Sequence, residues 1–234
     1  MTRRLAVGGA TIVAATLATM PFDVRIAEEM RDASPQRRVW MRDGARGFDV
    51  IGDPGVLVAS AAMYGVGRLV RSPGLTAVGM HSGEAVVIGG ATTSLLKLVA
   101  GRARPYASQN DAGAFTPGRV AGGHTSFPSG HTTVAFAFAA ATTAEIAARS
   151  HRAAWIAGPA LYGMATLVGG ARMYDDKHWA SDVVLGAGIG TVAGIETVAW
   201  NRAHPRNLVE RTFASVRVTP ARHGVAFGIE IASR

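Results

Sequence analysis

The sequence predicts an all-α fold, a bundle of about six core helices embedded in a membrane, with a short β-hairpin at the C-terminal end. Six apolar stretches of helical length alternate with polar breaks along the chain. Apolar residues make up 48% of the 234 residues, charged residues only 17%, and 29 residues are glycine. This composition is typical of closely packed helices. Arginines occupy every second short break, as expected of a membrane protein.

The chain opens with the basic pair Arg3 and Arg4, followed by an apolar run from Leu5 to Phe22. A basic stretch before an apolar one is typical of a signal peptide, although the small-residue cleavage site here is poor. We therefore expect residues 1–22 to be either a signal peptide or a first transmembrane helix. Both interpretations imply export or membrane insertion.

The remaining chain divides into one predicted domain, residues 23–206, and a tail, residues 207–234. Residues 23–53 are polar and mixed in charge, and they end in the breaking sequence Asp53-Pro54-Gly55. Five further apolar stretches are each long enough for a helix, and they cover residues 56–70, 75–100, 132–148, 153–170 and 183–200. In the tail, apolar residues alternate from Val216 to Ile231 around a central turn, which predicts the β-hairpin.

The distribution of arginine predicts the orientation in the membrane. If Arg3 lies inside, six spans also place Arg68, Arg149 and Arg202 inside, as the positive-inside rule requires. This predicts a protein of the bacterial cell envelope, in the inner membrane, with the long loop 104–128 on the outer, periplasmic face. Mean hydropathy is only +0.19, which is low for six spans. A soluble periplasmic or secreted bundle, released by signal cleavage, is the alternative.

The net charge of +8 comes almost entirely from arginine, since the chain has two lysines among 24 basic residues. The excess indicates either an anionic partner or a general bias in composition. Because the arginines are scattered, nucleic acid is not an expected partner. The absence of cysteine excludes disulfides, thiolate metal sites and a cysteine nucleophile. No paired-carboxylate motif is evident, so we expect neither a metal nor a cofactor.

The first segment with chemical character joins Lys97 to Arg104-Pro105. The two cations are seven positions apart, about two helical turns, so both can reach one side of a helix end. Lysine supplies a point charge and arginine a two-pronged donor for phosphate oxygens. The alternative is a basic helix end at a membrane interface, and Arg102 fits that alternative better than Arg104 does.

The second segment, Pro128-Ser129-Gly130-His131, precedes a long apolar stretch. A helix that begins here offers backbone N–H groups to an anion, Gly130 permits close approach, and Ser129 or Thr132 can cap the helix. His131 would stand beside the bound anion and give a proton to a leaving oxygen. The alternative is an ordinary helix cap with an incidental histidine.

The third segment contains Arg172, His178 and Asp182. His178 and Asp182 are four positions apart, so a helix would place the carboxylate beside the imidazole. The carboxylate would hold one tautomer of the ring and make it a better nucleophile. In isolation, this pair is equally compatible with a structural surface contact.

Together the three segments resemble the signatures of the type 2 phosphatidic acid phosphatase (PAP2) family, whose site is similar to those of class A acid phosphatases and vanadium haloperoxidases. Lys97 with Arg104-Pro105 matches the first signature, residues 128–131 match the second, and Arg172, His178 and Asp182 match the third. Ala171 stands where the third signature has serine. The matched region covers residues 97–182.

The resemblance implies hydrolysis of a phosphomonoester or diphosphate without a metal, on a lipid such as phosphatidic acid or a prenyl diphosphate. By this resemblance His178 attacks phosphorus to form a phosphohistidine, Asp182 orients it, and His131 protonates the leaving group. The implied phosphate-binding residues are Lys97, Arg104, Ser129, Gly130 and Arg172.

Three alternatives to a lipid phosphatase are an exported soluble acid phosphatase for small esters, a vanadium-dependent haloperoxidase and a non-enzymatic protein that binds anionic lipid. The sequence does not indicate an oligomeric state.

Overall fold

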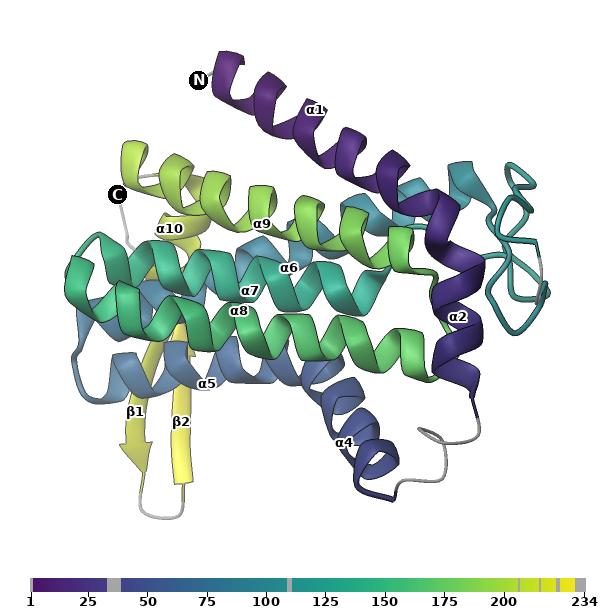
Figure 1. Cartoon of the computed structure of the whole chain (residues 1–234). Helices are drawn as coiled ribbons and strands as arrows, with labels where there is room; N and C mark the ends of the chain where they lie inside the picture. Colours follow the sequence, from purple (N-terminus) through teal and green to yellow (C-terminus); the bar gives the residue numbers. More distant parts are fainter. Residues whose placement is uncertain are drawn as a thin grey trace.

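The computed structural model describes residues 2–32, 39–108, 111–205, 207–214, 216–221 and 224–229. Its bundle consists of the six long helices that the sequence predicts (Figure 1): α1 (Thr2–Thr19), α5 (Val56–Leu69), α6 (Pro73–Ala100), α7 (Gly130–Ala147), α8 (His151–Tyr174) and α9 (Ala180–Ala203). The last four begin two or three residues before the predicted apolar stretches, and α8 and α9 also end three or four residues after them. Shorter helices are α2 (Asp23–Arg31), α4 (Val39–Val50) and α10 (Leu208–Ala214).

Helix α7 runs through the middle of the bundle, in contact with α6, α8 and α9 (Figure 1). Its buried residues are mostly alanine and threonine. On α9, the spaced glycines Gly186, Gly190 and Gly194 face it, and a Cβ on Gly190 would lie 2.2 Å from the carbonyl oxygen of Thr133. Small residues on both helices therefore let the two backbones come into direct contact.

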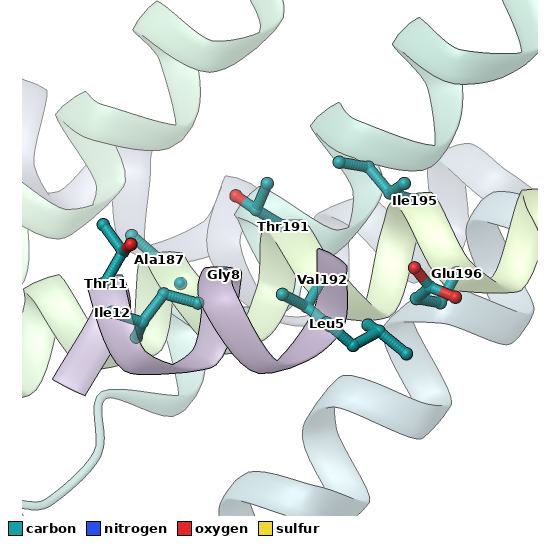
Figure 2. Close-up of a pocket in the computed structure, with 10 residues that line it drawn as sticks. Leu5, Gly8, Thr11, Ile12, Ala187, Thr191, Val192, Ile195 and Glu196 are labelled. Atoms are coloured by element: carbon teal, nitrogen blue, oxygen red, sulfur yellow. The ribbon is translucent and has the colours of Figure 1, made fainter. Parts of the chain in front are cut away.

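The N-terminal helix lies on the outside of the bundle. Helix α1 continues through a 3₁₀ turn at Met20–Phe22 into α2, and it packs beside α9 (Figure 1). Figure 2 shows the largely apolar groove between α1 and α9, of about 510 Å³, lined among others by Leu5, Ile12 and Val192. Most of the rest of α1 is exposed, as expected for a helix surrounded by lipid, and Thr16 is buried.

The predicted break at residues 53–55 is wrong in one respect. The chain does not leave the helix there but forms a π-helical turn over Ile51–Gly55, which leads from α4 into α5. Pro54 cannot donate a backbone hydrogen bond, and the wider turn accommodates it. The turn places Gly52 against the ring of His131, at a distance where a Cβ would meet ring carbon Cδ2 at 3.1 Å.

Three helical segments of the described chain are long and apolar enough to cross a membrane: Leu5–Arg31, Pro73–Ala100 and Ala180–Ala203. Helix α5 is apolar but shorter, and α7 and α8 do not reach this composition, so the prediction of six apolar spans is only partly met. The physical reason for α7 is its central position. Its buried polar residues, such as Thr132, Thr133 and Glu145, face protein and need no apolar surface toward lipid.

The tail forms the predicted hairpin. Strands β1 (Val216–Ala221) and β2 (Gly224–Ile229) pair antiparallel, with Val216 opposite Ile229 and Ala221 opposite Gly224. Ile231, the last residue of the predicted alternation, lies outside the described residues. The hairpin lies beside α5, at the end of the bundle opposite the long loop between α6 and α7 (Figure 1).

Candidate active site

The three sequence segments meet at one end of the bundle, where α6 and α8 end and α7 and α9 begin (Figure 1). They enclose a cavity of about 250 Å³. Six of the eight predicted site residues line it: Lys97, Arg104, Gly130, His131, Arg172 and His178. The other two, Ser129 and Asp182, are fully buried behind this lining.

Helix α6 ends so that its last cation points at the cavity. Gly101 has a left-handed backbone, with φ of 56°, and a Cβ there would lie 1.8 Å from the carbonyl oxygen of Thr116. Only glycine fits this turn without strain. Lys97, one turn before the end, donates through Nζ to the carbonyl oxygens of Thr125 and Ser126 at 2.6 and 3.3 Å. The lysine is therefore held by the loop that carries the second segment.

Two arginines complete the cationic wall of the cavity. The Nε atoms of Arg104 and Arg172 are buried and have no hydrogen-bond partner among the described residues. Arg172 also forms an ion pair with Asp49 from α4, a contact that the sequence analysis did not predict. Three cations around one small cavity, two with unpaired buried donors, fit an anion with several oxygens, such as phosphate.

The second segment forms the start of α7 as predicted, although its serine acts differently. Ser129 is the N-cap residue, but its hydroxyl does not cap the helix. Oγ lies 2.8 Å from Oγ1 of Thr132, and the side chain is wholly buried. The proposed capping bond of Ser129 is therefore absent, because Thr132 takes up its hydroxyl. Gly130 and His131 line the cavity at the helix N-terminus, where backbone amides favour an anion.

His178 and Asp182 lie side by side, but not within one helix as predicted. His178 precedes α9, while Asp182 lies in its first turn and accepts a hydrogen bond from the backbone N–H of Trp179 at 2.9 Å. This capping bond, together with one from Ser126 Oγ, fixes the carboxylate. Nδ1 of His178 is 3.5 Å from Oδ2 of Asp182, which is ion-pair distance rather than hydrogen-bond distance.

The environment of His178 keeps its imidazole neutral. Burial lowers the pKa of His178 to about 4, and the positive charges of Lys97 and Arg104 act in the same direction. Together they outweigh Asp182, which favours the protonated ring. A neutral imidazole keeps the lone pair that a nucleophile needs.

Arg102 corrects the sequence analysis most clearly. In the alternative interpretation of the first segment it fitted a basic helix end at a membrane interface better than Arg104 did, but its side chain is only 1% exposed. It donates to Oδ1 of Asp182 at 2.6 Å and to Oδ2 of Asp23 at 2.7 Å. The sequence feature that could have pointed to Arg102 as a site residue was its place within the first segment, two positions before Arg104. The corresponding feature for Asp23 was weaker: it is the first charged residue after the apolar run.

Among the described residues, no three His, Cys, Asp or Glu side chains gather closely enough to hold a metal ion. The cavity itself presents a cationic anion cradle with two histidines. This arrangement can bind a phosphoryl group, attack it and protonate the group that leaves.

The sequence profile of the PAP2 superfamily matches residues 79–206, more than half of the chain, including all eight predicted site residues. The chain belongs to the PAP2 superfamily. This PAP2 protein is 39% identical over 89 residues to a lipid A 1-phosphatase of Porphyromonas gingivalis. The match covers 36% of the chain and 19% of that relative, so the chain matches about a fifth of the relative's length.

A solved structure shares the PAP2 fold. The crystal structure of the first transmembrane PAP2 type phosphatidylglycerolphosphate phosphatase from Bacillus subtilis superimposes with a TM-score of 0.52 at 18% identity. The match covers 82% of this chain and 98% of that one. At this identity the likeness concerns the fold, and it agrees with the all-α bundle that the sequence predicts.

Proposed function

We propose that this PAP2 protein is a membrane phosphatase that hydrolyses the phosphomonoester or diphosphate of a lipid without a metal ion. The observation that carries the proposal is the cavity at the end of the bundle, in which three cations surround a neutral, buried His178. The names of the two similar proteins, both lipid phosphatases, support the same class of substrate.

The reaction follows from the positions of the side chains. Nδ1 of His178 is directed at Asp182, so Nε2 attacks phosphorus, and a P–N bond forms as the ester P–O bond breaks. His131 donates a proton to the leaving oxygen. Lys97, Arg104 and Arg172 stabilise the charge on the phosphoryl oxygens. Water, deprotonated by His131, then displaces the phosphate and restores the free histidine.

The shape of the cavity favours a lipid over a small ester. Besides the charged residues, it is lined by Ser94 and Gly90 on α6 and by Val134 on α7. Gly90 lies seven residues before Lys97, about 10 Å lower along a helix that is long and apolar enough to span a membrane. The cavity thus continues from the cations toward the depth of the acyl chains, where a lipid tail can remain in the bilayer.

The orientation proposed from the sequence fits this arrangement. Arg68, Arg149, Arg152 and Arg202 lie at the ends of α5, α7, α8 and α9 that are remote from the cavity. By the positive-inside rule the cavity faces the outer side of the membrane, which in a bacterial inner membrane is the periplasm.

A phosphate-release panel tests the proposal. Purified protein in detergent with EDTA is given phosphatidic acid, a prenyl diphosphate, lipid A and p-nitrophenyl phosphate. We expect release from at least one lipid, and His178→Ala should abolish it while the exposed His151→Ala should not. Full turnover by His178→Ala would refute the mechanism. Release from p-nitrophenyl phosphate alone would replace the lipid phosphatase by a small-ester phosphatase.

An acid- and alkali-quench experiment tests the covalent step. With a substrate labelled in the phosphoryl group, quenched protein should carry label that is stable in alkali and lost in acid, as a phosphoramidate requires. We expect no such label on His178→Ala. Label retained by that variant would assign the nucleophile to another residue.

A further inference from the structure

The carboxylate behind the nucleophile belongs to a larger buried group of charges. Asp182 is paired through Oδ1 with Arg102, and Arg102 is paired in turn with Asp23. The side chains of Asp23 and Asp182 are 0% exposed and that of Arg102 is 1% exposed. Charges this deeply buried are costly unless they are paired and fully hydrogen-bonded.

Each nitrogen of the Arg102 guanidinium donates a hydrogen bond. Nη1 donates to Ser181 Oγ at 2.8 Å as well as to Asp182, and Nε and Nη2 donate to the carbonyl oxygen of Ala112 at 2.9 and 2.7 Å. The guanidinium carbon lies 5.1 to 5.7 Å from the ring centroids of Phe115, Phe127 and Trp179, which exclude water from it. The arginine therefore has one fixed position.

Asp23 is fixed with equal completeness. Oδ1 accepts the backbone N–H of Ser181 at 2.8 Å, and Oδ2 accepts its hydroxyl at 2.5 Å. Ser181 directly precedes Asp182 in the first turn of α9. The first residue of α2 thus holds the turn that carries the catalytic carboxylate, both directly and through Arg102.

The signs of the charges give this chain of contacts an electrostatic role. Arg102 alone would neutralise Asp182 and leave no negative charge behind His178, because the other charges that act on this histidine, Lys97 and Arg104, are cations. Arg172, which also lines the cavity, is paired with Asp49. Asp23 compensates Arg102, so the group of three keeps one net negative charge. That charge favours the imidazolium-like state that develops when the histidine attacks.

We propose that Asp23 and Arg102 are positioning residues of the reaction, which hold the Asp182 carboxylate beside His178 and keep the charge behind that histidine negative. The inference rests on the proposed phosphatase function. It extends the site beyond the three matched segments to the junction of α1 and α2.

The test is the pH dependence of phosphate release from phosphatidic acid in detergent micelles by Asp23→Asn. We expect kcat to fall about 10- to 100-fold with KM within about two-fold, since the residue does not touch the substrate. Because Arg102 is then uncompensated, the imidazolium is less stable, and the acid limb of kcat/KM should move to lower pH. Asp43→Asn is the matched control, since Asp43 is exposed on α4 and only weakly paired.

Asp23→Glu and Ser181→Ala separate the effect of charge on the reaction from the effect of the position of Asp182. Both retain every charge, so we expect lower kcat with the acid limb in its original place. If Asp23→Asn does not fold, Arg102→Gln gives the opposite change of charge, and its acid limb should move to higher pH. If Asp23→Asn and Arg102→Gln lower kcat but leave the acid limb of kcat/KM at its original pH, then Asp23 and Arg102 have only a structural role. That result would overturn the proposal.

The two proposals fail in different ways. If wild-type protein releases no phosphate from any lipid or ester, the phosphatase function itself is wrong. If wild-type protein is active and Asp23→Asn behaves like Asp43→Asn, only the positioning role is wrong.

Discussion

His178 is a buried base in a cationic cavity, and this environment sets the pH range of the proposed reaction. Its pKa of about 4 lies below the ordinary value of 6.5 for histidine, so the ring is mostly neutral from about pH 5 upward. Protonation removes the lone pair, and activity is therefore lost as the pH falls through the lowered pKa. We expect kcat/KM to decline near pH 4 to 5 rather than near 6.5.

The measurement is kcat/KM from pH 3.5 to 8, corrected for the titration of the substrate phosphate near pH ~6. Protein held at each pH and returned to neutrality must recover its activity, which excludes unfolding as the cause. A decline centred on 6.5 would show that the histidine is solvated or that Asp182 dominates it.

Arg104 should contribute to transition-state binding. Its side chain lines the cavity with an unpaired buried Nε, so it is ready to bind phosphoryl oxygens. We expect Arg104→Ala to lower kcat/KM by about 10²- to 10³-fold, the usual loss for one such donor. Arg119→Ala, in the exposed part of the same loop, should be near wild type. Equal losses in both variants would point to disruption of the loop instead.

The sequence pattern selected residues that line the cavity, but it did not select Asp23 and Arg102 behind Asp182. Lys97, Arg104, His131 and Arg172 were selected because their residue types match phosphate chemistry, and all four line the cavity. Arg102 was not, because a sequence does not tell whether a cation at a helix end meets lipid, water or a buried carboxylate. The proximity of His178 and Asp182 was predicted from helical geometry, whereas a capping turn produces it.

At the scale of elements, the contact between α7 and α9 should limit stability. A methyl group on Gly190 would meet the backbone of α7 at 2.2 and 2.8 Å, where nothing flexible can move aside. We expect Gly190→Ala to reduce the free energy of unfolding by about 1–3 kcal/mol, measured as a lower Tm in detergent. Gly163→Ala on α8 has open space around its Cβ and should not lower Tm. An unchanged Tm for Gly190→Ala would contradict this packing.

The π-helical turn should affect the reaction. Gly52 faces both His131 and the buried Val168, and a Cβ there would approach side-chain atoms of His131 at 3.1 and 3.3 Å and Cγ1 of Val168 at 2.9 Å. We expect Gly52→Ala to lower kcat about 10-fold by displacing the proton donor, and the contact with Val168 to lower Tm as well. Gly47→Ala on α4, where a Cβ meets nothing, is the control. A normal kcat in Gly52→Ala would exclude any influence of this turn on His131.

The helices themselves were predictable because apolar stretches of this length are longer than ordinary strands and are typical of helices. Helices α6 and α8 begin two residues earlier than predicted, because Ser72 and Ser150 cap them. The π-helical turn was not predictable, because Asp53-Pro54-Gly55 has the composition of an ordinary break. The central position of α7 was also not predictable from the sequence. Alanine and threonine occur both on helix surfaces that face lipid and in the interior of a bundle.

At the scale of the whole molecule, the orientation in the membrane can be tested directly, because the chain has no cysteine. Ala121→Cys lies in the exposed part of the long loop, and Arg152→Cys lies on the exposed first turn of α8, at the opposite end of the bundle. We expect a membrane-impermeant maleimide to label the first and not the second when added from the periplasmic side. The reverse pattern would place the cavity in the cytoplasm, and labelling of both would indicate a protein that does not span the membrane.

The hydrogen bond between Asp23 and Ser181 joins residues that are 158 positions apart. At about 5–20 residues per second, a ribosome adds Ser181 roughly 8–30 s after Asp23. During that interval Arg102 can meet Asp23, but the turn that both must hold does not yet exist. The turn that carries Asp182 therefore cannot take its final position until both partners of this contact have been made.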